Sequence, residues 1–368
     1  MALQCGIVGL PNVGKSTTFN ALTRGKALAA NYPFATKDPN VGVITVPDPR
    51  LDKLEELVNP QRVVPTTVEI VDIAGLIKGA SQGEGLGNQF LANIREVDAI
   101  IHVVRCFDDD NVVHVDGSVN PVRDKEVIDL ELCLKDLETV EKRLEKTARA
   151  AKSGSKDDLK DLELLQKLKQ HLEQGRVTRE LLGDLDEDGK RLMKELSLLT
   201  AKPILYVCNV DEAALAAGGN AHTRAFEQAV AAENARVLHL CADVEAQISE
   251  METEEERAEF LEMMGLEAPG AHKLIREAYT LLNLITYFTA GEKEVRAWTV
   301  RRGAKAPESA GVIHSDFERG FIRAEVIKYD DFVSYGSEAK VKEAGKMAVE
   351  GKEYVTQDGD IMHFRFNV

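Results

Sequence analysis

Residues 9–17 (GLPNVGKST) carry glycine, lysine and serine at a spacing that can surround a chain of phosphates. The two glycines remove side chains that would block backbone N–H groups, and Lys15 can reach the β and γ oxygens. Ser16 offers a hydroxyl to Mg²⁺, and a helix that begins near Lys15 adds the positive end of its dipole. Because the apolar residues 5–8 precede the loop as a strand would, the pattern predicts a nucleoside triphosphate site. The expected contacts are Asn12, Val13, Gly14, Lys15, Ser16 and Thr17.

Two further residues complete a predicted Mg²⁺ site. Asp72 follows the apolar residues 68–71, so its carboxylate lies at a strand end, where a phosphate-loop fold approaches the metal. Thr36 comes after the first helix, where nucleotide switches place a threonine hydroxyl on Mg²⁺. Ser16, Thr36 and Asp72 then supply oxygen ligands, and phosphate and water supply the rest. The alternative for Asp72 is a carboxylate that caps a helix. The glycine-rich residues 79–87 are either a nucleotide-ordered switch or a surface loop.

The motif that reads the base favours adenine over guanine. Guanine-specific relatives use Asn-Lys-x-Asp, whose last carboxylate accepts from two guanine N–H groups, whereas residues 209–212 here are NVDE. Val210 replaces the lysine and Glu212 replaces the aspartate. Residues 241–243 (CAD) also lack the lysine that packs on the base in the second base-side loop. Asn209 can still pair with the adenine edge, so we expect Asn209 and Val210 at the base and ATP as the substrate.

A water-orienting group is missing from its usual place. Position 76 often carries glutamine in this class of site, but Leu76 can neither donate nor accept a hydrogen bond. Asn12 is one substitute, because its amide oxygen can hold a monovalent cation, with K⁺ the candidate, between the phosphates. His114 is another, since a neutral imidazole can orient water; the alternative is a solvated loop histidine. The predicted catalytic residues are therefore His114, Lys15 and Asn12.

The order of elements predicts an α/β fold with a parallel core sheet. Strand-like runs alternate with helical patterns, and between residues 122 and 199 the apolar residues take helical spacing, which indicates an antiparallel helix pair that turns at residues 151–156. Residues 289–300 read as a hairpin in a β-rich C-terminal part. The predicted strands of the first part are residues 6–9, 41–46, 68–72, 99–105, 203–208 and 236–240.

Composition limits the class of protein. A chain of 368 residues predicts two or three domains, and the absence of a long apolar run or a leader predicts a cytoplasmic protein without a membrane partner. Five scattered cysteines without a CxxC pair argue against a disulfide framework and against zinc. A net charge of −16 speaks against coating nucleic acid through the overall field, and no DNA partner is expected.

Two local basic patches contrast with this acidic charge. Six cations lie between residues 141 and 156, and four lie around Trp298. Both patches can meet rRNA or tRNA phosphates, with Trp298 available for base stacking; the alternative is a solvated face and a core tryptophan. The cations are Lys142, Arg143, Lys146, Arg149, Lys152 and Lys156 in the first patch, and Arg296, Arg301, Arg302 and Lys305 in the second.

These motifs together resemble the YchF/Obg-like ATPase family of translation-factor P-loop proteins, in family order along essentially the whole chain. The resemblance implies a P-loop NTPase domain, an inserted coiled-coil-like helical domain and a C-terminal TGS domain with a ubiquitin-like β-grasp fold. It also implies ATP hydrolysis, binding to the ribosome, and a catalytic role for His114. We place the nucleotide domain at residues 1–120 and 200–280, the helical insertion at 121–199 and the TGS domain at 281–368.

Two other functions stay open at this point. One is an Obg-class GTPase with relaxed base specificity. The other is a nucleotide-stabilised RNA-binding or ribosome-binding adaptor without useful turnover.

Overall fold

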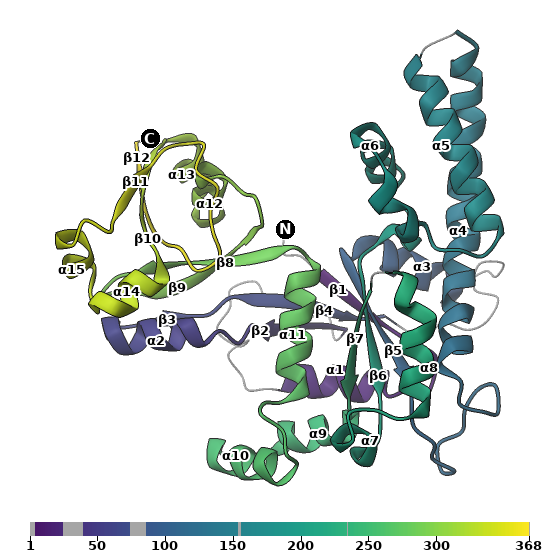
Figure 1. The fold of residues 1–368 in the computed structure, drawn as a ribbon, viewed down its shortest axis with the longest axis horizontal. Helices are drawn as coiled ribbons and strands as arrows, with labels where there is room; N and C mark the ends of the chain where they lie inside the picture. Colours follow the sequence, from purple (N-terminus) through teal and green to yellow (C-terminus); the bar gives the residue numbers. More distant parts are fainter. Residues whose placement is uncertain (1–3, 25–39, 74–85, 154–155, 234, 368) are drawn as a thin grey trace. The chain divides into compact units, whose positions relative to one another are not determined.

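The computed structural model describes residues 4–24, 40–73, 86–153, 156–233 and 235–367 (Figure 1). The chain forms two compact units, one of Met1–Val43 with Glu69–Leu274 and one of Ile44–Val68 with Ile275–Val368. No helix in the described part of the chain is both long enough and apolar enough to cross a membrane.

The first unit is built on a six-stranded sheet whose recorded pairings between β1, β4, β5, β6 and β7 are all parallel. The central strand β5 has every residue buried, as expected when helices cover both faces of a parallel sheet. The predicted parallel core is therefore present. In spatial order the strands are β2 (Val41–Thr45), β4 (Thr67–Asp72), β1 (Gln4–Val8), β5 (Ala99–Arg105), β6 (Ile204–Asn209) and β7 (Arg236–Leu240).

Strand register brings the predicted chemistry to one edge of this sheet. Ile7 pairs with Asp72, so β1 and β4 end close to each other, and Arg105 pairs with Asn209, so β5 and β6 do the same. Because these neighbouring strands are parallel, all four direct their carboxyl ends to the same edge of the sheet. In parallel α/β sheets this edge is where ligands bind. The connecting helices of this unit are α1 (Lys15–Arg24), α3 (Leu86–Glu96), α7 (Glu212–Ala216), α8 (Ala221–Val230), α9 (Ala242–Glu250), α10 (Glu254–Met263) and α11 (Gly270–Leu281), which continues into the second unit.

Two long helices, α4 (Pro121–Ala150) and α5 (Lys156–Glu173), lie side by side (Figure 1). The side chain of Asn120 caps α4 and Pro121 occupies its first turn, where proline costs no hydrogen bond. Their apolar stripes share a core with α6 (Glu187–Leu196). Short 3₁₀ turns border these helices at η2 (Ala151–Ser153), η3 (Thr178–Asp184) and η4 (Leu199–Ala201). The buried core residues include Val140, Leu165, Leu168, Leu172, Leu192 and Met193.

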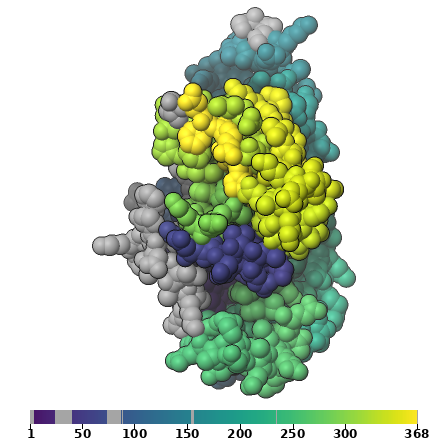
Figure 2. Space-filling view, turned by 90° about the vertical axis from the view of Figure 1, so that its left-hand side faces the viewer, coloured from purple at the N-terminus to yellow at the C-terminus, as the bar shows by residue number. Residues whose placement is uncertain are grey.

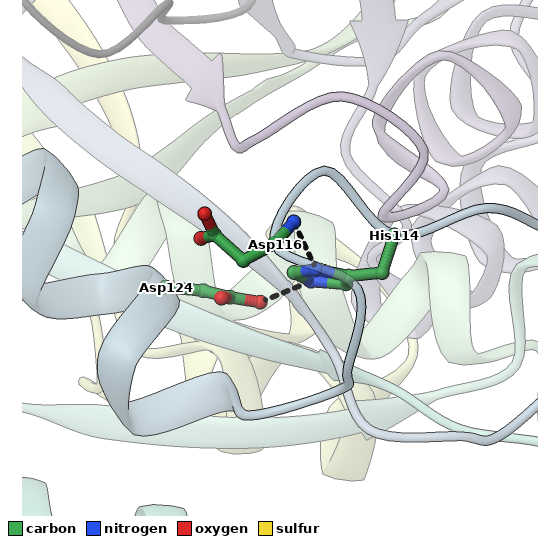
Figure 3. Close-up of side chains that lie close together, drawn as sticks. All are labelled: His114, Asp116 and Asp124. Atoms are coloured by element: carbon green, nitrogen blue, oxygen red, sulfur yellow. Dashed lines mark hydrogen bonds and ion pairs between the residues drawn. The ribbon is translucent and has the colours of Figure 1, made fainter.

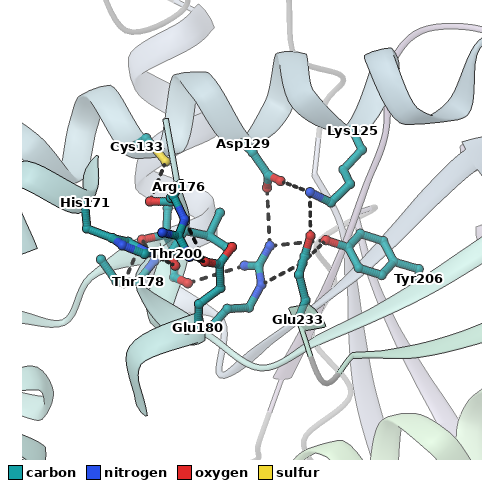
Figure 4. Close-up of polar contacts among 12 residues, drawn as sticks. Lys125, Asp129, Cys133, His171, Arg176, Thr178, Glu180, Thr200, Tyr206 and Glu233 are labelled. Carbon is teal, nitrogen blue, oxygen red and sulfur yellow. Dashed lines mark hydrogen bonds and ion pairs between the residues drawn. The ribbon is translucent and has the colours of Figure 1, made fainter. Parts of the chain in front are cut away.

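A buried network of charges fixes the beginning of α4 to the sheet (Figure 4). Lys125 Nζ lies 2.6 Å from both Asp129 Oδ2 and Glu233 Oε1, at the end of the 3₁₀ turn η5 (Ala231–Glu233). Arg179 joins the same two carboxylates at 3.3 and 3.2 Å, and the Tyr206 hydroxyl of β6 donates to Glu233 Oε2 at 2.7 Å. Each buried charge thus has an opposite charge and hydrogen bonds, which its desolvation requires.

The second unit holds another six-stranded sheet with helices on both faces and two apolar cores. The predicted hairpin is present as β8 and β9, which pair antiparallel from Leu284 with Arg301 to Ala290 with Val295. In spatial order the strands are β11 (Ala348–Glu350), β10 (Phe321–Ile327), β12 (Ile361–Phe366), β8 (Leu284–Ala290), β9 (Val295–Arg301) and β3 (Val63–Val64). The helices are α2 (Pro49–Val58), α12 (Ala306–Ile313), α13 (Ser315–Arg319), α14 (Tyr329–Tyr335) and α15 (Glu338–Glu343).

One segment differs from the domain boundaries that we expect from the sequence. Residues 44–68, which we group with the nucleotide domain, belong to the second unit, where β3 pairs with β9 through Val63 and Val295. Leu51 and Leu54 of α2 are buried in the same core as Phe332. Figure 2 shows the surface of this segment, coloured dark blue, beside the yellow C-terminal residues.

Candidate functional site

The phosphate loop, residues 9–14, joins the buried strand β1 to α1 and has an unusual backbone. Asn12 and Gly14 have positive φ angles of 63° and 91°. A Cβ at Gly14 would collide with Asn209 Nδ2, and a Cβ at Gly9 would lie 2.7 Å from the Val103 carbonyl oxygen. Both glycines are therefore required by close approach of neighbouring chain, and Asn tolerates the left-handed region better than most residues.

The structure brings two of the predicted site residues into direct contact. Lys15 Nζ forms an ion pair with Asp72 Oδ1, and the two side chains are 11% and 20% exposed. Ser16 follows Lys15 in the first turn of α1 and is exposed, as a ligand contact would need. A hydroxyl and a carboxylate are oxygen donors that suit Mg²⁺. Thr36, Leu76 and residues 79–85 lie outside the described residues.

Asn209 uses both ends of its amide to hold protein segments together. Its Nδ2 donates to the Val13 carbonyl oxygen at 3.0 Å, and its Oδ1 accepts from the Ala242 backbone N–H at 2.9 Å. The residue is only 4% exposed. It therefore fastens the phosphate loop to the beginning of α9, a structural role beyond the expected base contact.

Residues 210–212, which follow Asn209, do not have the side chains or the positions that a guanine-binding motif needs. Val210 is 2% exposed, and its backbone N–H donates to the Leu240 carbonyl oxygen at 2.9 Å. Asp211 caps α7 by accepting from the Ala214 N–H at 2.7 Å. Glu212 is exposed as the first residue of that short helix. No lysine stem is available here to pack on a base, as the sequence indicates.

His114 lies in a loop of residues 106–120, the His114 loop, and its side chain is 4% exposed (Figure 3). The ring Nδ1 accepts from the Asp116 backbone N–H at 3.1 Å, and Nε2 lies 2.8 Å from Asp124 Oδ2. Because Nδ1 accepts, the proton of a neutral ring resides on Nε2 and is donated to Asp124. The imidazole is thus neither solvated nor free to contact water at the phosphate loop in this conformation.

Three residues that our sequence reasoning missed position this loop. The guanidinium of Arg105, a residue 1% exposed, donates to the carbonyl oxygens of Phe107, Val112 and Asp109 at 3.0, 2.8 and 3.1 Å. Asp124 and Arg123 hold the imidazole from the first turn of α4. A lone arginine that ends an apolar strand is a signal that could have identified Arg105.

Asn12 reaches the His114 loop rather than standing alone. Its Nδ2 donates to the Val113 carbonyl oxygen at 3.0 Å, so the phosphate loop and the backbone next to His114 are adjacent. The structure thus places the two predicted substitutes for the missing glutamine in neighbouring segments.

His114, Asp116 and Asp124 also place potential ligand atoms within 4.8 Å of one another. Arg123 already pairs with both carboxylates, at 3.5 Å from Asp116 Oδ2 and 3.1 Å from Asp124 Oδ1. A guanidinium in this position repels a cation, and both ring nitrogens are engaged, so we assign no metal to this cluster.

Comparison with known proteins covers the whole chain. A family model described as "50S ribosome-binding GTPase" matches residues 4–144, and YchF-GTPase_C, described as a protein of unknown function (DUF933), matches residues 284–367. The chain is similar to the ribosome-binding ATPase YchF of Bacillus subtilis, with 56% identity, and to that of Escherichia coli O157:H7, with 54%; each match covers 100% of both chains.

A solved structure agrees with this assignment. The structure of the Schizosaccharomyces pombe YchF GTPase matches with a TM-score of 0.89 and 40% identity, over 99% of this chain and 97% of that one. Because the chain is 56% identical to a YchF protein over its full length and has the fold of a solved YchF structure, it belongs to the YchF family.

Proposed function

We propose that the chain is a cytoplasmic, Mg²⁺-dependent ATPase that hydrolyses ATP to ADP and phosphate and binds the ribosome as a nucleotide-dependent switch. The observation that carries the proposal is the Lys15–Asp72 pair at the carboxyl edge of the parallel sheet, beside the phosphate loop. A cation for phosphate and a carboxylate for metal side by side are the two groups that phosphoryl transfer needs.

The roles follow from chemistry at these positions. Backbone N–H groups of the phosphate loop and Lys15 bind the phosphates. Ser16, Thr36 and Asp72 would hold Mg²⁺, which would supply positive charge against the phosphate oxygens. Asn12 would hold a monovalent cation, K⁺, which would supply further positive charge near the phosphates, and His114 orients the attacking water. For His114 this requires a change from the conformation described above, because both of its ring nitrogens are engaged.

ATP is proposed as the substrate because the buried Val210 and the exposed Glu212 do not rebuild a guanine clamp. The curated bacterial relatives are named ATPases. An Obg-class GTPase with relaxed base specificity is the second candidate, favoured by the name of the Schizosaccharomyces pombe relative and by the description of the matching family model.

Titration with fluorescent ATP and GTP separates these two candidates. We expect tighter ATP binding, and tighter GTP binding would reverse the assignment. Lys15→Ala is expected to lower turnover by about 10²- to 10³-fold, since it removes a fixed charge at the developing negative charge. Lys160→Ala, which changes a lysine 61% exposed on α5, is the matched control and keeps the wild-type rate.

Ribosome binding is proposed to use the two basic patches. Lys142, Lys146 and Arg149 are exposed near the end of α4, where they form the basic tip. In the second unit, the Arg296 guanidinium lies 3.9 Å from the centre of the Trp298 ring, which also stacks with Tyr287. Arg296 therefore covers the ring, and an RNA base would stack on Trp298 only after displacing it. In this proposal residues 121–199 form an inserted coiled-coil-like domain and residues 281–368 a TGS domain of β-grasp type.

Co-sedimentation with ribosomes tests the partner and the nucleotide together, in ATP, ADP, GTP and a non-hydrolysable ATP analogue. Lys146→Glu with Arg149→Glu is expected to weaken association and to lower its salt dependence, because phosphate contacts release counterions. Lys190→Glu with Arg191→Glu, on exposed residues of α6, is the matched control. If association with ribosomes were the same with every nucleotide and unchanged by Lys15→Ala, the result would favour a non-catalytic adaptor.

A further inference from the structure

The His114 loop presents its side chains in alternation. Val113 and Val115 are 75% and 53% exposed, whereas His114 between them is buried. The loop therefore exposes two apolar side chains to water and buries the imidazole of His114. A backbone rotation that brings His114 outward would carry a valine inward, so the exchange would lose hydrogen bonds but gain apolar burial.

The buried imidazole of His114 lies in a segment that contacts the phosphate loop. Asn12 holds the Val113 carbonyl, so His114 is the next residue after a contact with the phosphate loop. Its ring nevertheless points to Asp124 and the Asp116 N–H (Figure 3).

Asp124 is the fixed partner in this arrangement. It lies in the first turn of α4, where its backbone N–H donates to the Asn120 carbonyl oxygen and its Oδ1 accepts from Arg123 Nη2 at 3.1 Å. The next residue, Lys125, is tied to Glu233 in the buried network (Figure 4). Asp124 is therefore held in place by the helix that carries it.

We propose that Asp124 is a positioning residue that holds His114 in the Nε2–H tautomer and away from the phosphate loop. Hydrolysis then requires His114 to leave Asp124. This inference rests on the proposed role of His114 in orienting water. It predicts that the free protein turns over slowly because most molecules keep the ring on Asp124.

Steady-state kinetics of the full chain test the proposal. Asp124→Ala is expected to raise kcat by about tenfold with KM for ATP unchanged, the factor that corresponds to loss of one hydrogen bond to a charged group. Asp124→Asn keeps a carbonyl acceptor for Nε2–H and is expected to restore kcat toward the wild-type value. Glu126→Ala, which removes an exposed carboxylate two residues along α4, is the control. An unchanged or lower kcat in a folded Asp124→Ala variant would overturn the proposal.

Two further measurements separate this proposal from the role of His114 itself. In a His114→Ala background, Asp124→Ala should no longer raise kcat, and an equal rise would refute positioning through His114. Long-range ¹H–¹⁵N NMR should find the Nε2–H tautomer in the wild type and a mixture in Asp124→Ala; an Nδ1–H wild type would refute the proposal. If His114→Ala alone kept the wild-type rate, the catalytic role would fail, and the tautomer measurement would still decide whether Asp124 positions the ring.

Discussion

Asn209 connects three segments through a single buried amide, which accounts for the presence of asparagine at the end of β6. One bond reaches Val13 in the phosphate loop and the other reaches Ala242 at the beginning of α9. Among the described residues, the Val13 carbonyl oxygen and the Ala242 N–H have no other hydrogen-bond partner outside the regular helices and strands. Asparagine is the side chain that supplies a donor and an acceptor together at this length.

Asn209→Ala is therefore expected to destabilise the fold and to weaken ATP binding. Two buried backbone groups would lose their partners, at about 1–3 kcal/mol each. Urea unfolding measures the first effect and nucleotide titration the second. Asn20→Ala, at an exposed position of α1, is the control. A loss of stability no larger than that of the control would contradict the bridging role.

His102 of β5 makes stability depend on pH. Burial, followed by the nearby charges of Lys125 and Arg179, lowers the pKa of His102 to about 3. An unfolded histidine has a pKa of about 6.5, so the unfolded chain binds a proton that the folded chain refuses. Stability is therefore fully present above about pH 6.5 and falls as the pH drops toward 3, by about 1.4 kcal/mol per pH unit for this group.

His102→Phe should remove this contribution while keeping the ring contact with Tyr206, whose centroid is 5.6 Å away. The free energy of unfolding is measured in urea at pH 7 and at pH 5. The decrease from pH 7 to pH 5 should be smaller in His102→Phe than in the wild type, by about 2 kcal/mol. His222→Gln, at a side chain 28% exposed, should leave the wild-type difference in place. An identical pH dependence in His102→Phe and wild type would show that His102 does not carry the effect.

At the scale of elements, the beginning of α4 joins the buried network to the His114 loop. Burial alone would lower the pKa of Lys125, but Asp129 and Glu233 outweigh it and raise that pKa, so the ammonium stays charged. Removing one member leaves opposite charges buried without full compensation, which costs far more than losing a surface pair.

Lys125→Met is therefore expected to lower the free energy of unfolding by on the order of 3 kcal/mol. Lys135→Met, on the same helix and paired with Glu138 at the surface, is the control and should change stability by less than about 1 kcal/mol. Chemical denaturation of the two variants gives the comparison. Equal effects would mean that the network contributes little beyond a surface ion pair.

Elements with strong local patterns could be predicted from the sequence. Strand β5 is an apolar run that only His102 interrupts before Arg105, and α4 is preceded by the cap Asn120 and begins with Pro121. Both elements therefore lie close to where the residues indicate. The Lys15–Asp72 contact was also foreseeable, because Lys15 begins the helix that follows β1 and Asp72 ends β4, the parallel neighbour of β1.

Long-range pairings could not be predicted in the same way. The membership of residues 44–68 in the second unit depends on β3, which is only Val63–Val64 and too short to give a periodic signal. The burial of His114 depends on Asp124 and on a backbone N–H, neither of which the loop sequence marks. Expectations for Thr36 and Leu76 remain predictions.

At the scale of the whole molecule, the second unit is assembled from two distant stretches of chain. Leu51 and Leu54 of α2 are buried among residues from the C-terminal stretch, including Phe288 and Phe332. A chain that ends at Leu274 would therefore leave the apolar face of α2 uncovered, and exposed faces of this kind promote aggregation.

We expect such a truncated chain to be less soluble than the full chain and to melt at a lower temperature. Light scattering and thermal unfolding measure the two properties. Supplying residues 275–368 as a separate polypeptide should restore solubility if the uncovered core is the cause. A monomeric truncated chain with the full-length melting temperature would contradict this account of α2.

The same divided core sets a timetable for synthesis. Of the two stretches that form the second unit, residues 44–68 leave the ribosome first. Strand β12, which lies between β10 and β8 in the sheet of this unit, begins only at Ile361. At ~5–20 residues per second, the early segment waits for its partners on the order of tens of seconds. During that interval Leu51 and Leu54 have no native core to enter. We therefore expect the apolar face of α2 in the nascent chain to stay exposed until the C-terminal stretch has been made.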